Sequence, residues 1–334
     1  MARSLEPATA ARAGDVVRLP PGSRDVLPEE ARELRAISEG VRGVFEEAGY
    51  GEVKTPTLEY ADVLARGDVG EVTPTYRLVD DRGAWLALRS DMTVPIARVA
   101  ATRYPADSEP LRFWYDRIAY QPVPALQGRA HEVQQVGVEL IGVEGGDGDR
   151  EVLQLAAAAL DAVQLADARL VVGDARLSET LLRGAGLGDD AIAAAHDALA
   201  GGQFVALEQV LSDGGLSGDD LDEVVGLLRM RGPADVLAEH ARDLDIHAAE
   251  LAQTIASLPP EVRARVIVDV GLVRNLGYYS GLVFDVVHPA LGEPLGGGGR
   301  YDGLVGRFGA DRPAVGFALA VDLVHRAQTL GGAA

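Results

Sequence analysis

The sequence predicts an α+β domain built on a mainly antiparallel sheet that is flanked by helices and interrupted by a helical insert. Strand-like segments alternate with helical ones before residue 150, and Ala, Leu, Asp and Gly with helical periods dominate residues 150–261. Strand patterning returns near residue 264. No doubly wound βαβ series is visible, so one discontinuous sheet domain explains this order best.

The N-terminal part of the chain predicts a tail followed by an amphipathic helix. Ala, Arg and Pro dominate residues 1–18 without an apolar period, which predicts a disordered tail. Pro28 and two glutamates then suit a first helical turn, and the helix closes near Gly49. Its apolar face has helical spacing: Leu34, Ile37, Val41, Val44 and Phe45.

The segments before residue 150 justify the sheet. Residues 50–66 predict a strand and a short helix, and residues 75–87 predict a hairpin around Asp-Asp-Arg-Gly. LRSDMT at residues 88–93 predicts a turn that leads into a helix. Two further strands are expected at residues 111–123 and 131–142, joined by a loop with Pro and Gly.

The rest of the chain predicts an insert and a return to the sheet. ARLVVGDARLSETLLRGAG at residues 168–186 is the exception in the helical part, a short strand that leads into a helix. Residues 313–330 predict a final strand and helix. We expect a sheet domain of residues 19–154 and 261–330, with a helical insert over residues 155–260.

Composition excludes several classes of function. The 31 basic and 51 acidic residues give a net charge of -20, which repels polyanions and disfavours nucleic acid as a partner. Without cysteine there is no disulfide framework, thiolate metal site or cysteine nucleophile, and the histidines lack metal-ligand spacing. No segment has the apolar length of a signal peptide or membrane span. We therefore expect a soluble cytoplasmic protein without a metal or cofactor.

The stretch GEPLGGGGRYDGLVGRFG at residues 292–309 raises a separate question. It lacks the Lys-Ser/Thr of a P-loop and does not open a helix directly after a strand, so a phosphate cradle is disfavoured. Two interpretations stay open. The glycines either form a tight strand-to-strand crossing or let the backbone approach a bound ligand.

Two polar segments offer candidate ligand contacts. Asp91 and Thr93 could receive an ammonium group, although an ordinary helix N-cap is the better explanation of this segment alone. Gln135, Gly137 and Glu139 alternate, so on a strand they share one face, with Gly137 leaving room for a ligand. A solvated strand face is the alternative.

A third segment, RNLGYYSG, supplies Arg274, Tyr278 and Tyr279 just before a strand. In extended chain the two adjacent phenols would point to opposite faces, which puts one of them inward. A core tyrosine without a ligand is the alternative.

Together these segments resemble the catalytic domain of histidyl-tRNA synthetase, which has a class II synthetase fold. LRSDMT, GRAHEVQQVGVELIG, LVRNLGYYSGLVFD and GGGGRYDGLVGRFG with PAVGFAL occur in that family's order, and the resemblance covers roughly residues 18–326. Pro56 stands where the dimer-forming motif has its proline.

The resemblance implies a pocket for histidine. Carboxylate and amide acceptors would bind the ammonium group, a carboxylate and a phenol the imidazole nitrogens, and a guanidinium the ligand carboxylate. The glycine stretch would form the floor and walls near this pocket. The matching positions are Asp91, Thr93, Gln135, Glu139, Arg274, Tyr278 and Tyr279.

The positions that would bind ATP depart from the synthetase pattern. Gln121 stands where the second motif has an arginine, and Leu323 and Asp322 stand where the third motif has an arginine and a glutamate. Losing two cations aimed at a reacting phosphate should slow adenylation by on the order of 10³-fold or more. Asn275 and Gly277 also replace the usual Gly and Asp before the tyrosines, which leaves Arg274 and both tyrosines in place.

With these departures at the ATP positions, and with no anticodon-binding domain expected, the chain resembles the regulatory subunits of short-form ATP phosphoribosyltransferase. The LRPDMT-type segment of that family has Asp at the position of Asp91. That resemblance implies a non-catalytic homodimer that assembles with a short catalytic subunit into a hetero-octamer, without tRNA. It also implies histidine feedback control of the first step of histidine biosynthesis. A stand-alone histidine-activating ligase and a decayed paralogue without a ligand stay open as alternatives.

Overall fold

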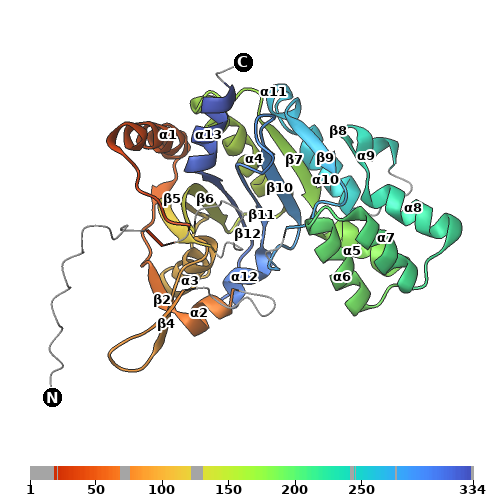
Figure 1. Ribbon diagram of the computed structural model, residues 1–334, viewed down its shortest axis with the longest axis horizontal. Coiled ribbons are helices and arrows are strands. Elements are labelled where there is room, and N and C mark those ends of the chain that lie inside the picture. Colours follow the sequence, from red (N-terminus) through yellow and green to blue (C-terminus); the bar gives the residue numbers. More distant parts are fainter. Residues whose placement is uncertain are drawn as a thin grey trace, which may run out of the picture.

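A nine-stranded mixed sheet runs through the centre of the molecule (Figure 1). The computed structural model describes residues 19–20, 22–67, 76–121, 131–240, 244, 246–274 and 277–331. The strands follow the order β1-β5-β6-β12-β11-β10-β7-β9-β8. They are β1 (Gly51–Glu52), β5 (Leu111–Tyr120), β6 (Glu132–Ile141), β7 (Arg169–Asp174), β8 (Arg231–Pro233), β9 (Val266–Asp269), β10 (Leu282–Val287), β11 (Gly296–Arg300) and β12 (Ala314–Ala320).

The sheet is antiparallel from β5 to β7, and its parallel pairs are β1 with β5 and β7 with β9. This confirms the mainly antiparallel α+β fold that the sequence predicts. The strands expected at residues 111–123 and 131–142 form the long β5–β6 ladder, in which Leu111 pairs with Ile141 and Tyr120 with Glu132.

One face of the sheet is covered by α1 (Pro28–Glu47), α4 (Gly145–Ala162) and α13 (Val321–Gly331) (Figure 1). The predicted apolar stripe of α1 is confirmed, because Leu34, Ile37, Val41 and Phe45 are buried in the main core, while Val44 is partly buried against it. The helix ends at Glu47, two residues before Gly49, which has a φ of 84°. Residues with that backbone are commonly glycine, so the predicted stop is explained.

The opposite face carries α2 (Ala61–Ala65), α3 (Thr93–Arg103) and α12 (Asp302–Gly306), which share a second core. Beside them lies a three-stranded sheet of β2 (Leu58–Tyr60), β4 (Trp85–Leu88) and β3 (Arg77–Val79). The β3–β4 pair is the predicted hairpin at residues 75–87, of which residue 75 lies outside the described part. This second core forms one wall of the candidate site.

The helices of the middle region gather at one end of the molecule, far from α1 and β2 (Figure 1). The helices α5 (Ala175–Gly184), α6 (Asp189–Ala200), α7 (Phe204–Asp213) and α8 (Gly218–Leu228) bury a third core of their own. Three more helices, α9 (Val236–Glu239), α10 (Ile246–Ala256) and α11 (Pro260–Arg263), lead back to the sheet. Within the range predicted as an insert, β7 is a strand of the main sheet, paired with β10 and β9.

Some expectations fall on residues that the structure does not describe. These are the tail at residues 1–18, the loop at residues 122–130 and Asn275. In the described ranges, every helix is too short or too polar to cross a membrane. The same ranges contain no group of at least three His, Asp or Glu side chains that could hold a metal ion.

Candidate functional site

Glu139 of β6 lies at the centre of a buried polar cluster. Its carboxylate is 1% exposed and accepts hydrogen bonds on both oxygens. The Thr93 hydroxyl at the start of α3 donates to Oε1 over 2.9 Å, and the Tyr301 hydroxyl just after β11 donates to Oε2. The Tyr115 hydroxyl on β5 is 3.5 Å from Oε1. Segments that are far apart in the sequence thus converge on one acid.

Burial controls the charge of this cluster. The pKa of Glu139 is raised to about 8, mainly because burial removes water from its carboxylate; the Tyr301 and Thr93 hydroxyls lower the pKa, and the nearby Asp91 carboxylate raises it. The carboxyl group therefore titrates at about pH 8, far above the usual range of a glutamate. The same burial raises the pKa of Tyr115 and Tyr301, so both phenols stay protonated and can donate.

Tyr278 and Tyr279 both point into this region, which corrects the expectation that they face opposite sides. Their ring centroids are 5.0 Å apart, and Tyr278 also packs edge-on against Tyr301 at 5.9 Å. Strict alternation holds only in extended chain, and Tyr278 lies in a turn that precedes β10. The turn brings both phenols to one side.

Asp91 and Thr93 meet the cluster from the first turn of α3. Asp91 Oδ1 accepts from the Val94 N–H at 3.0 Å, which is the contact that the helix-cap alternative predicts. Its charge also raises the pKa of Tyr115 and Tyr278. Asp91 is therefore both an anchor of the helix start and a negative charge at the cluster.

The glycine stretch forms β11, between β10 and β12, and its glycines make room for site residues. A Cβ at Gly297 would lie 2.0 Å from Nη1 of Arg274, and one at Gly299 would lie 2.9 Å from the Tyr279 ring. These positions admit no side chain without displacing a candidate residue. The interpretation as a strand crossing is confirmed, and the approach of this backbone to a bound ligand stays a prediction.

The sequence suggested that Gly137 of β6 leaves room for a ligand, but in the structure this space is filled. Gly137 pairs directly with Tyr115 across the β5–β6 ladder, and a Cβ there would lie 2.7 Å from the Tyr115 hydroxyl. The neighbouring strand fills the gap with a phenol that the sequence analysis missed. Its position on the same face as Glu139 follows from the register, which one strand alone does not give.

Arg274 and Gln135 lie at the margins of the cluster. Arg274 Nη1 donates to the Asp285 carboxylate and, over 2.9 Å, to the Phe284 carbonyl, and the guanidinium lies 5.9 Å from the Tyr279 ring. Its Nε is buried without a partner in the described ranges. Gln135 is half-buried on β6, and its side chain makes no hydrogen bond to any residue that the structure describes. The structure therefore links Arg274 to the cluster through the Tyr279 ring, and Gln135 only through the strand face that it shares with Glu139.

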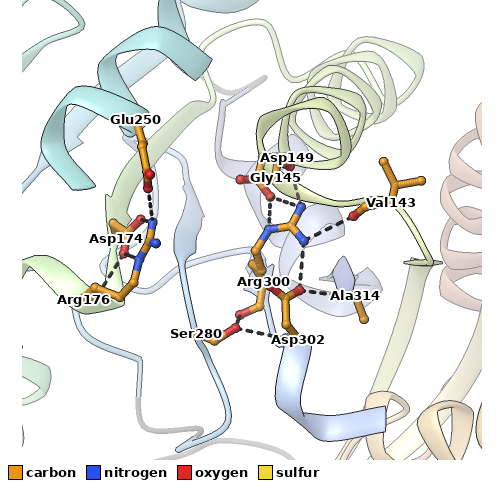
Figure 2. Close-up of polar contacts among 10 residues, drawn as sticks. All are labelled: Val143, Gly145, Asp149, Asp174, Arg176, Glu250, Ser280, Arg300, Asp302 and Ala314. Carbon is orange, nitrogen blue, oxygen red and sulfur yellow. Dashed lines mark hydrogen bonds and ion pairs between the residues drawn. The ribbon is translucent and has the colours of Figure 1, made fainter. Parts of the chain in front are cut away.

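Arg300 points away from the site, toward α4 (Figure 2). It is 5% exposed, and its guanidinium donates to Asp149 at 2.8 Å, to the Gly145 carbonyl at 2.7 Å and to Asp302 at 2.9 Å. The next residue, Tyr301, faces Glu139. Alternation along β11 thus separates a structural arginine, which anchors the start of α4, from a phenol of the site.

The positions that would bind ATP carry other interactions. The Gln121 backbone N–H donates to the His131 carbonyl at 2.9 Å, Leu323 packs against the main core, and Asp322 pairs with Arg24 at 2.5 Å. Two nearby cations are also paired. Arg117 contacts Glu52 at 3.1 Å, and Arg326 contacts Glu293 at 3.0 Å. Arg129 lies outside the described residues.

The chain is similar to several known proteins over most of its length. The family model described as histidyl-tRNA synthetase matches residues 22–324. An ATP phosphoribosyltransferase regulatory subunit from Symbiobacterium thermophilum is 38% identical over 95% of this chain and 81% of that protein. One from Moorella thermoacetica is 36% identical over 94% of this chain and 83% of its own length.

A solved structure gives the same result. The Bacillus halodurans protein described as an ATP phosphoribosyltransferase regulatory subunit/histidyl-tRNA synthetase superposes with a TM-score of 0.85 at 30% identity, over 93% of this chain and 83% of that one. The fold and these comparisons therefore define a histidyl-tRNA synthetase-like protein of the class II fold. Within that class, the chain belongs to the family of ATP phosphoribosyltransferase regulatory subunits.

Proposed function

We propose that this chain is the non-catalytic regulatory subunit of ATP phosphoribosyltransferase. In this role it is required for activity of a short catalytic subunit and for feedback control by histidine in the first step of L-histidine biosynthesis. The observation that carries the proposal is a buried carboxylate among hydroxyl donors, since Thr93 and Tyr301 both donate to Glu139. The resemblance puts Gln121 and Leu323 where the synthetases have their phosphate-binding arginines.

L-Histidine is the proposed ligand of the Glu139 cluster. Glu139 and a tyrosine phenol would bind the imidazole nitrogens, and Arg274 would bind the ligand carboxylate. The half-buried Asp91, Thr93 and Gln135 supply acceptors for the ammonium group. Arg274 is already paired with Asp285, so a ligand carboxylate would share or replace that contact.

Loss of adenylation chemistry is part of the proposal. A guanidinium binds phosphate in a fixed geometry that glutamine and leucine do not provide. Arg117 and Arg326 each form an ion pair with a carboxylate. These pairs support the proposal that neither arginine binds phosphate. The chain would therefore bind histidine without activating it, and catalysis would reside in the partner.

A homodimer through the first-motif region is supported by an exposed apolar face on the small sheet. Cross-strand pairs put Leu58 beside Leu88 and Leu78 beside Leu86 on one face. Leu58 is 42% exposed and Leu78 is 47% exposed. Exposed contiguous apolar side chains of this kind mark association surfaces. Two such dimers with catalytic subunits would make the proposed hetero-octamer.

Feedback follows from differential binding. Histidine inhibits only to the extent that it binds the inactive arrangement of the complex more tightly than the active one. The phenols and the hydroxyl around Glu139 come from α3, β5 and the segment after β11. A ligand that changes these contacts would act on several elements of the sheet domain at once.

Calorimetric titration of the purified chain with histidine, and then with ATP, tests this proposal. We expect the wild type to bind histidine and not ATP, and Glu139→Ala to lose histidine binding. Glu132→Ala, an exposed acid on the same strand, is the matched control and should bind as the wild type does. ATP binding with pyrophosphate exchange would instead support a histidine-activating ligase.

A further inference from the structure

A groove crosses the helical region between α5 and α8. It is a hollow of about 640 Å³. The two helices lie on the side of the molecule far from α1 and the small sheet (Figure 1). The floor of the groove consists of apolar side chains that are half-buried, and its rim of exposed small and polar residues. The floor is Leu181, Leu216, Val224 and Leu227, and the rim is Thr180, Gly184, Asp220 and Glu223.

The spacing of the lining residues shows that each helix presents one continuous stripe. On α5 the stripe repeats at helical spacing from Leu177 to Gly184, and on α8 from Asp220 to Leu227. The core beneath is already closed, since Leu182, Leu211 and Leu228 are at most 1% exposed. The groove is therefore a surface that lies over a filled core, and the α8 stripe of about 10 Å matches about two turns of a docked helix.

The rim carries uncompensated negative charge. Asp220 and Glu223 are exposed on α8, and neither forms an ion pair with any residue in the described part of the chain. Elsewhere in the helical region Glu208 pairs with Arg229 at 3.3 Å and Glu179 with Arg183 at 2.9 Å, whereas Asp219 and Asp222 on the outer side of α8 also form no ion pair with a described residue. An occupant that brings lysine or arginine beside an apolar stripe would complement this rim.

We infer that this groove docks an amphipathic, basic helical segment of the ATP phosphoribosyltransferase catalytic subunit. The inference rests on the proposed function, which supplies that partner. A second copy of this chain fits poorly, because a symmetric contact through the groove would bring two acidic rims, each with Asp220 and Glu223, against each other. A homodimer formed through the small sheet would also leave the groove uncovered, since the two surfaces lie at opposite ends of the molecule (Figure 1).

Charge reversal on α8 tests the inference with a matched control. Asp220→Lys/Glu223→Lys alters the rim, and Asp219→Lys/Asp222→Lys makes the same charge change on exposed residues of the same helix that do not line the groove. Affinity for the purified catalytic subunit from the same genome is measured by sedimentation or calorimetry. We expect the rim variant to bind at least about tenfold more weakly and the control to stay within about threefold of the wild type.

A pair of glycine variants tests whether the groove must be open for binding, independently of charge. Gly184 lines the groove and Gly226 lies elsewhere on α8, and an added Cβ meets nothing within 4 Å at either position. Both are exposed helical residues, so Gly184→Trp and Gly226→Trp should fold equally well. Only Gly184→Trp should block binding.

The outcomes separate the inference from the function on which it rests. A wild type that binds the catalytic subunit, together with rim and Gly184 variants that bind equally well, overturns the groove and leaves the proposed function intact. A wild type that does not bind the catalytic subunit overturns both. Wild-type self-association that only the groove variants weaken would assign the groove to a second copy and overturn the inference.

Discussion

Glu139 and Gly316 face each other across β6 and β12, and a Cβ at residue 316 would lie 1.9 Å from Oε2 of Glu139. The glycine therefore provides the space in which the buried carboxylate sits. The carbonyl of Val138 lies 2.5 Å from the same Cβ position, so the backbone also opposes any side chain there. A residue without apparent chemistry thus determines whether the site can exist.

Replacement of this glycine should disable the site. We expect Gly316→Ala to lower the free energy of unfolding by about 1–3 kcal/mol, because an added methyl group overpacks the core. Histidine binding should be lost with it. Urea unfolding and calorimetry measure the two effects. Gly303→Ala on α12, where an added Cβ meets nothing within 4 Å, should change neither, and similar behaviour of both variants would refute the role of Gly316.

The protonation of Glu139 should make stability depend on pH. Its pKa rises from 4.5 to about 8 on folding, so the folded protein keeps a proton that the unfolded chain releases between those values. The contribution of Glu139 to stability should therefore fall as pH rises through this window. Glu139→Gln cannot ionise, so relative to the wild type its free energy of unfolding should increase from pH 5 to pH 8. Parallel curves for the two proteins would contradict the shift.

The Arg300 network should be essential to the fold. Arg300→Leu leaves Asp149 buried without its cation, and we expect a loss of about 3–5 kcal/mol in the free energy of unfolding. Removing both charges, as in Arg300→Leu/Asp149→Leu, should restore part of that loss. The exposed Arg326, which pairs with Glu293, provides the comparison: Arg326→Ala should cost less than about 1 kcal/mol. Equal losses would show that Arg300 is not a structural anchor.

The small sheet should control self-association. Leu58→Asp/Leu78→Asp places charges on the exposed apolar face. We expect light scattering during gel filtration to report a dimer for the wild type and a monomer for this variant. Val205, which is 84% exposed on α7, supplies the control variant Val205→Asp. A dimer that survives the double substitution would exclude this face.

Much of the architecture follows from the sequence because it depends on local periodicity. The stripe of α1, the β3–β4 hairpin and the β5 and β6 strands are all confirmed. The position of β7 within the main sheet was not evident from the sequence, because a local apolar pattern predicts a strand but not the strands with which it pairs. The insert boundaries at residues 155–260 stay a prediction.

The site was harder to predict where it depends on register and turns. Tyr115 could be identified as a site residue only from its pairing with Gly137 across the β5–β6 ladder. The shared side of Tyr278 and Tyr279 depends on a turn that strand alternation does not describe. Arg300 stands next to Tyr301, but successive side chains point to opposite faces, so Arg300 bonds Asp149 while Tyr301 bonds Glu139.

Rate measurements on the catalytic subunit test the central claim most directly. ATP phosphoribosyltransferase activity is measured for the short catalytic subunit alone, with this chain, and with this chain plus histidine, using wild type and Glu139→Gln. We predict that the wild-type chain raises the activity, that histidine lowers it again, and that Glu139→Gln weakens the histidine effect while still raising the activity. An activity that this chain leaves unchanged, or histidine inhibition that is identical with Glu139→Gln, would contradict the account.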